Sequence, residues 1–200
     1  MSFGSASTNN GYSSASNNIS NRDVCAVGKN IKLTATPATG YEVDKWWDGR
    51  VGDGKGTITD KAISRDDFAV TESNNTDFWV TFKPHIYYNT YSLRFIDKTL
   101  NADGTYTYTA LTNNHSSVNS TKFDTSKDFN NKTSYEGGSA NFSLANPKNI
   151  YGYRFLGWVD VTEGTKTAQE AATQASSITI NPRTSPADRK FEAVYELVHF

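Results

Sequence analysis

Residues 152–158 read Gly-Tyr-Arg-Phe-Leu-Gly-Trp, and residues 40–46 read Gly-Tyr-Glu-Val-Asp-Lys-Trp. The two stretches keep glycine, tyrosine and tryptophan in the same register, which indicates a divergent internal repeat. The segments 77–82 and 190–195 follow the two tryptophans at similar distances. A turn glycine followed by alternating large side chains is typical of a strand entered through a tight turn. The repeated motif therefore predicts two β modules in tandem.

The parity of the motif indicates how it packs. Tyr153 and Phe155 point to one face of a strand, whereas Trp158 has the opposite parity. A bulge before the tryptophan would return its side chain to that face, and Gly157 is a residue type that tolerates one. We therefore expect each motif to form an aromatic core plug. The predicted core residues of the two copies are Tyr41, Val43, Trp46, Phe82, Tyr153, Phe155, Trp158 and Tyr195.

Short runs that favour strands surround the motifs, and Thr, Val, Ile and aromatic residues are frequent in them. Asp103-Gly104 separates two alternating runs and predicts a hairpin. The helix-like stretch, residues 166–177, is rich in Ala, Gln and Glu. The fold class that follows is mainly β, with two small β-rich modules of β-grasp or sandwich-like type and at most one short helix. Further strands are expected over 30–37, 139–147, 176–182 and 189–198.

The chain is expected to have three parts: an extended polar N-terminal arm (1–23), a first β module (24–86) and a second β module (87–200). Residues 1–20 carry no charge and little apolar area, so on their own they have little to offset the entropy of ordering. We expect them to become ordered against a partner. The larger side chains of the arm, Phe3, Tyr12 and Ile19, are the predicted anchors.

The charge balance and the distribution of apolar residues argue against two classes of partner, nucleic acids and membranes. Lys plus Arg is 20 and Asp plus Glu is 21, which gives a net charge of −1. A protein that neutralises many phosphates carries a basic surplus, so we expect no nucleic-acid binding. The sequence has no run of about 18 apolar residues, and its N-terminus has no basic and apolar leader, so we expect neither membrane insertion nor a signal peptide.

Residues 46–57 partly fit a phosphate-binding loop, because Gly49 is followed after four residues by Gly54-Lys55. Such a loop requires Ser or Thr directly after the lysine and a helix beyond it. Here Gly56 follows the lysine, and the next residues alternate as in a strand. We interpret the stretch as a loop between two strands.

Residues able to support catalysis or metal binding are scattered. His85, His115 and His199 lie far apart, Cys25 is the sole cysteine, and no Gly-x-Ser-x-Gly elbow is present. We therefore expect no enzymatic activity, no cofactor and no metal site. Trp47 and Trp79 are the better functional candidates, because exposed indoles stack on sugars or partner proteins, although core packing is the alternative.

The second copy resembles the Listeria–Bacteroides repeat family, the internalin B-repeat type. The residues that carry this resemblance are Pro147, Gly152, Tyr153, Phe155, Gly157 and Trp158. The first copy is similar to the divergent branch of the same superfamily, with Lys45 in place of Gly157. The resemblance implies small β-grasp modules strung along bacterial surface proteins, where they act in attachment or spacing rather than in catalysis.

Two functional hypotheses follow from the arm and the resemblance together. In the first, the chain is a structural decoration protein on a phage virion surface, of the kind carried by crAss-like phages. Its arm would bind a capsid or other structural protein, and its β modules would project outward. In the second, it is a spacer or glycan-binding repeat fragment of a secreted bacterial adhesin, and its partner would be a host-surface glycan.

Overall fold

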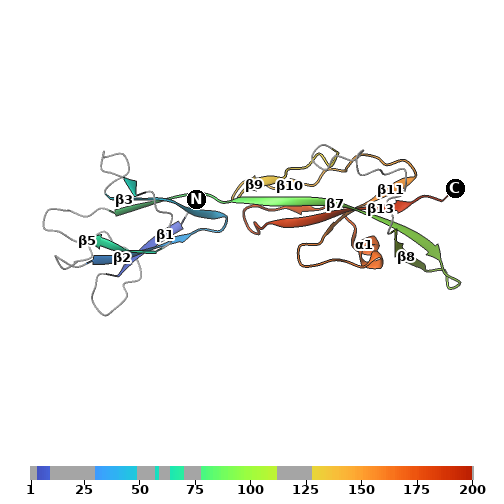
Figure 1. Cartoon of the computed structure of the whole chain (residues 1–200), viewed down its shortest axis with the longest axis horizontal. Coiled ribbons are helices and arrows are strands. Elements are labelled where there is room, and N and C mark those ends of the chain that lie inside the picture. The colour runs from blue at the N-terminus through green and yellow to red at the C-terminus, as the bar shows by residue number, and fades with distance from the viewer. Residues whose placement is uncertain are drawn as a thin grey trace. The chain divides into compact units, whose positions relative to one another are not determined.

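The computed structural model of the chain describes residues 4–9, 30–48, 57–58, 64–69, 78–111 and 128–199. The chain divides into two compact units, Met1–His85 and Ile86–Phe200. Strands dominate both units, and the described ranges contain one short helix (Figure 1). The expectation of a mainly β chain is confirmed.

The described residues of unit 1 form two three-stranded antiparallel sheets. The first sheet has the strand order β1-β2-β5 and the second has the order β4-β3-β6. The strands are β1 (Gly4–Asn9), β2 (Asn30–Pro37), β3 (Tyr41–Asp48), β4 (Thr57–Ile58), β5 (Ser64–Ala69) and β6 (Phe78–Pro84).

Residues 4–9 differ from the expected separate arm. They form β1 and pair with β2 in six consecutive positions, from Gly4 opposite Pro37 to Asn9 opposite Lys32. The segment Gly-Ser-Ala-Ser-Thr-Asn offers little apolar surface, which is why a free arm is expected from the sequence. A sheet edge also orders a strand through main-chain hydrogen bonds, which small Ser, Ala and Thr residues can form as well as larger ones. The remainder of the predicted arm lies outside the described residues.

Unit 2 is built around a mixed sheet with the order β11-β13-β7-β8. β13 lies between β11, to which it is antiparallel, and β7, to which it is parallel (Figure 1). The strands that open and close the unit are therefore neighbours. The elements are β7 (Ile86–Leu100), β8 (Tyr106–Ala110), β9 (Ser134–Glu136), β10 (Phe142–Ser143), β11 (Tyr153–Asp160), α1 (Ala168–Gln174), β12 (Thr179–Ile180) and β13 (Arg189–Leu197).

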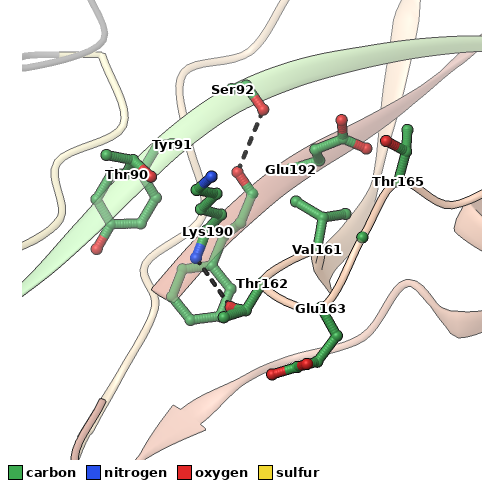
Figure 2. Close-up of a pocket in the computed structure, with 11 residues that line it drawn as sticks. Thr90, Tyr91, Ser92, Val161, Thr162, Glu163, Thr165, Lys190 and Glu192 are labelled. Atoms are coloured by element: carbon green, nitrogen blue, oxygen red, sulfur yellow. Dashed lines mark hydrogen bonds between the residues drawn. The ribbon is translucent and has the colours of Figure 1, made fainter. Parts of the chain in front are cut away.

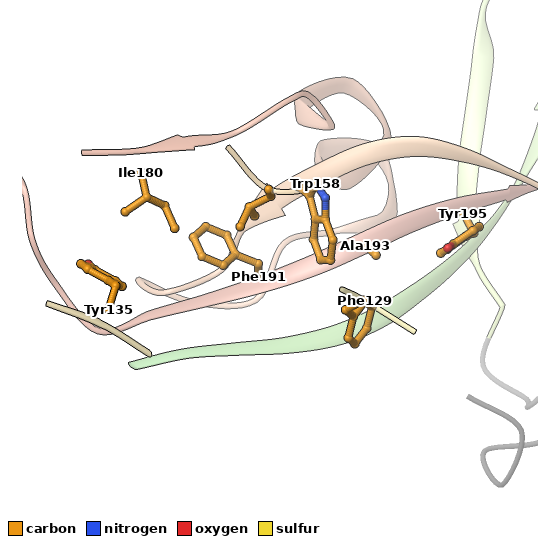
Figure 3. Packing of buried hydrophobic residues seen from close by; sticks show 8 residues of the cluster. Phe129, Tyr135, Trp158, Ile180, Phe191, Ala193 and Tyr195 are labelled. Carbon is orange, nitrogen blue, oxygen red and sulfur yellow. The ribbon is translucent and has the colours of Figure 1, made fainter. Parts of the chain in front are cut away.

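Both faces of this sheet are covered. Phe191, Ala193 and Tyr195 of β13 face a cluster that includes Phe129 and Trp158 (Figure 3). Val194 faces the other way and packs with Ile96, Val159 and the helix residue Ala171. The near-continuous burial of β13 is typical of a strand enclosed on both faces.

The helix and two expected strands are shorter than their sequence patterns indicate. α1 begins after Thr167, which forms a capping box with Glu170, and ends before Ser176, which forms a β-bridge with Trp158. Within 139–147 only β10 is a strand. Leu144 still donates to the carbonyl of Ile178 in the same register, but Ala145 donates to the Asn131 side chain and so leaves the ladder. Within 176–182 only β12 is a strand.

Candidate functional surface and the repeated aromatic hairpin

The two copies of the motif form the same antiparallel strand pair, β3 with β6 in unit 1 and β11 with β13 in unit 2. In unit 1, Val43 lies opposite Phe82, one residue of β3 is then skipped, and Trp46 lies opposite Val80. In unit 2, Phe155 lies opposite Tyr195, one residue of β11 is skipped, and Trp158 lies opposite Ala193. The predicted bulge before each tryptophan is therefore present at the same position in both units.

The turns that precede β3 and β11 also match. Gly40 and Gly152 have φ of 83° and 82°, values that glycine adopts readily. Each glycine carbonyl accepts a hydrogen bond from the residue after the closing strand, from His85 at 2.9 Å and from Val198 at 2.9 Å. These bonds join the turn before the first strand of each pair to the residue after the second strand, so the likeness of the two units extends beyond the three matching residues of the motif.

Trp158 is the centre of the larger aromatic core. Its side chain is 1 % exposed, and its indole Nε1 donates to the carbonyl oxygen of Ala145 at 3.0 Å. The rings of Tyr91, Phe129 and Phe155 lie around it, with centroid distances of 5.5, 5.5 and 6.0 Å. An indole with its polar atom satisfied and its faces covered by rings contributes mainly to packing.

Gly157 is required by a close backbone contact. A Cβ atom at this position would lie 2.5 Å from the backbone nitrogen of Ser176, and the residue has φ of 149°. Trp158 and Ser176 exchange two backbone hydrogen bonds, of 2.8 and 3.0 Å, at this place. The first copy has a bulge with Lys45 instead. The bulge alone therefore does not require glycine, whereas the approach of Ser176 does.

The other predicted core residues fall as follows. Trp46 and Val43 are buried, whereas Tyr41, Phe82, Tyr153 and Phe155 are half-buried. Tyr195 is buried, and its hydroxyl donates to the carbonyl of Lys148 at 2.7 Å. Burial raises the pKa of this phenol.

The structure brings together two of the predicted partner-binding residues. Trp47 and Trp79 are backbone register partners across β3 and β6, but their side chains lie outside the described part of the chain. The anchors Phe3, Tyr12 and Ile19 and the glycine-rich stretch 49–56 also lie outside it.

The two described histidines are separate. His85 Nδ1 lies 2.6 Å from Glu42 Oε2, and His199 Nε2 lies 2.5 Å from Asp97 Oδ1. The hydrogen bond with His85 is the main reason why the pKa of Glu42 is below its usual value. The described residues contain no group of three or more His, Cys, Asp or Glu side chains placed to hold a metal ion.

The most distinctive exposed surface lies on the β7–β8 hairpin. β13 pairs with β7 only as far as Ile96, so the hairpin tip continues beyond the sheet. Leu100 and Tyr106 face each other across the two strands, with 62 % and 46 % of their surfaces exposed. The Asp-Gly turn predicts this hairpin correctly, but the sequence does not reveal that its tip is left uncovered.

Charged side chains border this exposed pair. Lys98 Nζ lies 5.2 Å from the centre of the Tyr106 ring and 2.7 Å from Glu196 Oε1. Arg154 Nη2 contacts the same carboxylate oxygen at 3.1 Å. Together, Lys98, Leu100, Tyr106, Arg154 and Glu196 form what we call the hairpin patch.

The patch combines an aromatic ring with a net positive charge. Glu196 is 3 % exposed, and among the described residues its Oε2 atom is buried without a hydrogen-bond partner. One carboxylate thus faces two cations, and the hydrogen bond from Lys98 raises the pKa of that lysine. Lys98 is half-buried and Arg154 is exposed. An aromatic ring beside such cations suits the recognition of an anionic group on a sugar or a protein.

Two shallow polar hollows flank the loop after β11. One has a volume of about 420 Å³ and is lined by Thr90, Ser92, Thr162 and Lys190, among others (Figure 2). The other, of about 530 Å³, contains Asp160 and Arg189, whose Oδ2 and Nη1 atoms lie 3.1 Å apart.

The pKa of Asp160 reflects its structural role. Burial alone would raise it, but hydrogen bonds from Thr162 and Arg189 lower it below its usual value. These bonds tie the loop after β11 to the beginning of β13 and hold the carboxylate in its charged form.

Taken together, the fold and the surface define a tandem β-module protein whose repeated aromatic motif builds its cores. Residues 6–83 match the family model described as the divergent InlB B-repeat domain. The first unit therefore carries an InlB-like repeat, which is consistent with a surface or adhesin-type repeat protein. No curated protein and no solved structure matches the chain. No helix in the described ranges is long and apolar enough to cross a membrane.

Proposed function

We propose that the chain is a non-enzymatic surface protein in which two InlB-like β modules act in spacing and attachment. The observation that carries this proposal is the antiparallel strand pair with a bulge before the tryptophan of the Gly-Tyr-to-Trp motif, which both units form in the same register. Its first copy lies within the segment matched by the divergent InlB B-repeat domain. The large aromatic side chains of this motif pack in the core of each module. Such a module is a stable scaffold that presents its exposed surface to a partner.

The attachment surface in this proposal is the hairpin patch. Tyr106 offers a ring for stacking, while Lys98 and Arg154 offer positive charge at its edge. This combination favours an acidic glycan, whose ring stacks on tyrosine while its carboxylate or sulfate meets the cations. The partner that we propose is therefore an acidic host-surface glycan.

A glycan array carrying matched neutral and acidic sugars tests this assignment. The chain should bind acidic glycans, and the Leu100→Ala/Tyr106→Ala variant should lose at least about fivefold in affinity, because stacking and apolar contact are worth about 1 kcal/mol or more. The matched control is Thr107→Ala/Thr109→Ala, which changes exposed residues of opposite parity on β8. Binding that both double variants lose equally, or that neither loses, would assign the contact elsewhere.

The alternative site of action is the surface of a phage virion. This hypothesis depends on a free N-terminal arm that binds the capsid. In the structure β1, which is part of that arm, pairs with β2 of its own unit and does not lie free. We therefore propose a bacterial cell surface as the site of action. Protease shaving of intact producing cells and of purified particles from the same culture, followed by peptide mass spectrometry, separates the two placements. Peptides of this chain should be released from the cells. Release from the particles alone, with a constant number of copies of the chain per particle, would favour the virion.

A further inference from the structure

The strand β1 lies at the edge of the sheet β1-β2-β5 and pairs with β2 alone among the described strands. Its pairing is regular, since six consecutive residues face six residues of β2 without a shift. The segment reads Gly-Ser-Ala-Ser-Thr-Asn and contains no large side chain. Main-chain hydrogen bonds are therefore its principal means of attachment, and any chain of the same sequence can supply the same bonds.

The connection between β1 and β2 is far longer than the pairing requires. Neighbouring antiparallel strands are normally joined by two to five residues, whereas residues 10–29 separate Asn9 from Asn30. A connection of 20 residues can span up to about 66–72 Å when fully extended. That reach is sufficient to place β1 on the β2 edge of a neighbouring molecule.

We propose that β1 is an exchangeable strand that pairs with β2 of a second copy of this chain. The exchanged ladder has the same register as the closed one, so the strand gains and loses the same hydrogen bonds. This inference goes beyond the attachment function, because it concerns how copies join one another rather than what they bind.

Local concentration decides between the closed and the exchanged states. A strand tethered through a connection of 20 residues has an effective concentration on the order of 1 mM at its own edge. Dilute chains therefore close on themselves, whereas chains crowded at a surface exchange strands. Exchange would link neighbouring copies without any further contact surface.

Directed disulfide formation tests the exchange. Ser5 and Thr36 are register partners, and Thr36 is exposed. Directly opposed cysteines on antiparallel strands are close enough to form a disulfide. One chain carries Ser5→Cys and the other Thr36→Cys, both with Cys25→Ser, and the two are mixed under mild oxidation at total concentrations from 10 µM to 1 mM. The disulfide-linked heterodimer should rise from a minor to a major fraction across this range, as about 1 mM is approached.

Two controls distinguish exchange from random contact. Replacing Thr36→Cys by Thr109→Cys places the thiol on exposed β8 of unit 2, where the heterodimer should stay at least about tenfold lower. A single chain with both Ser5→Cys and Thr36→Cys, oxidised while dilute, has β1 locked to its own β2. It should remain monomeric by light scattering at 1 mM, whereas its reduced form should associate. A heterodimer yield equal to that of the Thr109 control at 1 mM, or equal association of locked and reduced chains, overturns the proposal.

Discussion

Gly157→Ala tests the structural reason for the glycine in the second motif. The added Cβ atom would lie 2.5 Å from the nitrogen of Ser176 and 2.8 Å from the carbonyl carbon of Ala175. Both are backbone atoms, so no flexible side chain can move aside. The contact lies where Trp158 and Ser176 exchange hydrogen bonds, and relieving it would pull the chain after α1 away from the sheet.

Two contributions set the size of the effect. A side chain at φ of 149° places the residue in a sparsely populated region, at a cost of about 1–3 kcal/mol. Overpacking against fixed atoms costs about 1–3 kcal/mol more. We therefore expect Gly157→Ala to lower the free energy of unfolding of unit 2 by about 2–6 kcal/mol, a large share of the stability of a small domain.

Gly152→Ala is the matched control. Gly152 also has a positive φ, of 82°, but no atom lies within 4 Å of its Cβ position. It should cost only the conformational strain, about 1–2 kcal/mol. Urea denaturation of the full chain, with hydrogen exchange of peptides from β13 and β3 read by mass spectrometry, assigns each loss to its unit. The reasoning is refuted if Gly157→Ala costs no more than Gly152→Ala, or if the loss appears in β3.

Three further outcomes are expected. Trp158→Ala should destabilise unit 2 by about 3–5 kcal/mol, the usual cost of removing a buried large aromatic. A loss below about 1 kcal/mol in the same assay would contradict the role of Trp158 as a central core residue. Raising the pH from 10 to 12 should destabilise unit 2, because burial raises the pKa of Tyr91 to about 12 from 10.0. The contribution of its neutral phenol is complete below pH 10 and is lost as the pH passes 12, so Tyr91→Phe should reduce the decline seen in pH-dependent denaturation. Deleting residues 2–9 should lower the melting temperature of unit 1 by about 4–8 °C, since loss of an edge ladder worth about 1 kcal/mol has that effect in a domain of this size, and an unchanged transition by calorimetry would show that β1 adds nothing to its own module.

Local patterns in the sequence determined the elements whose signals come from near neighbours. The Asp103-Gly104 hairpin, the helix within 166–177 and the bulge before each tryptophan all follow from turn chemistry, propensity and strand parity. The repeat was also visible, because glycine and the large aromatics are needed at the same places in both copies. The exposed patch was not predicted, because Leu100 and Tyr106 alternate like any half-buried strand.

Which of these elements meet depends on contacts between distant parts of the chain. Ser176 approaches Gly157 from beyond the helix, Phe129 enters the core from a polar stretch, and β1 adds to the edge of its own module. The parallel pairing of β13 with β7 joins residues about 100 positions apart. Such pairings depend on the match of two distant surfaces and on where an unpaired edge remains, and neither leaves a periodicity or a turn signal in the local sequence.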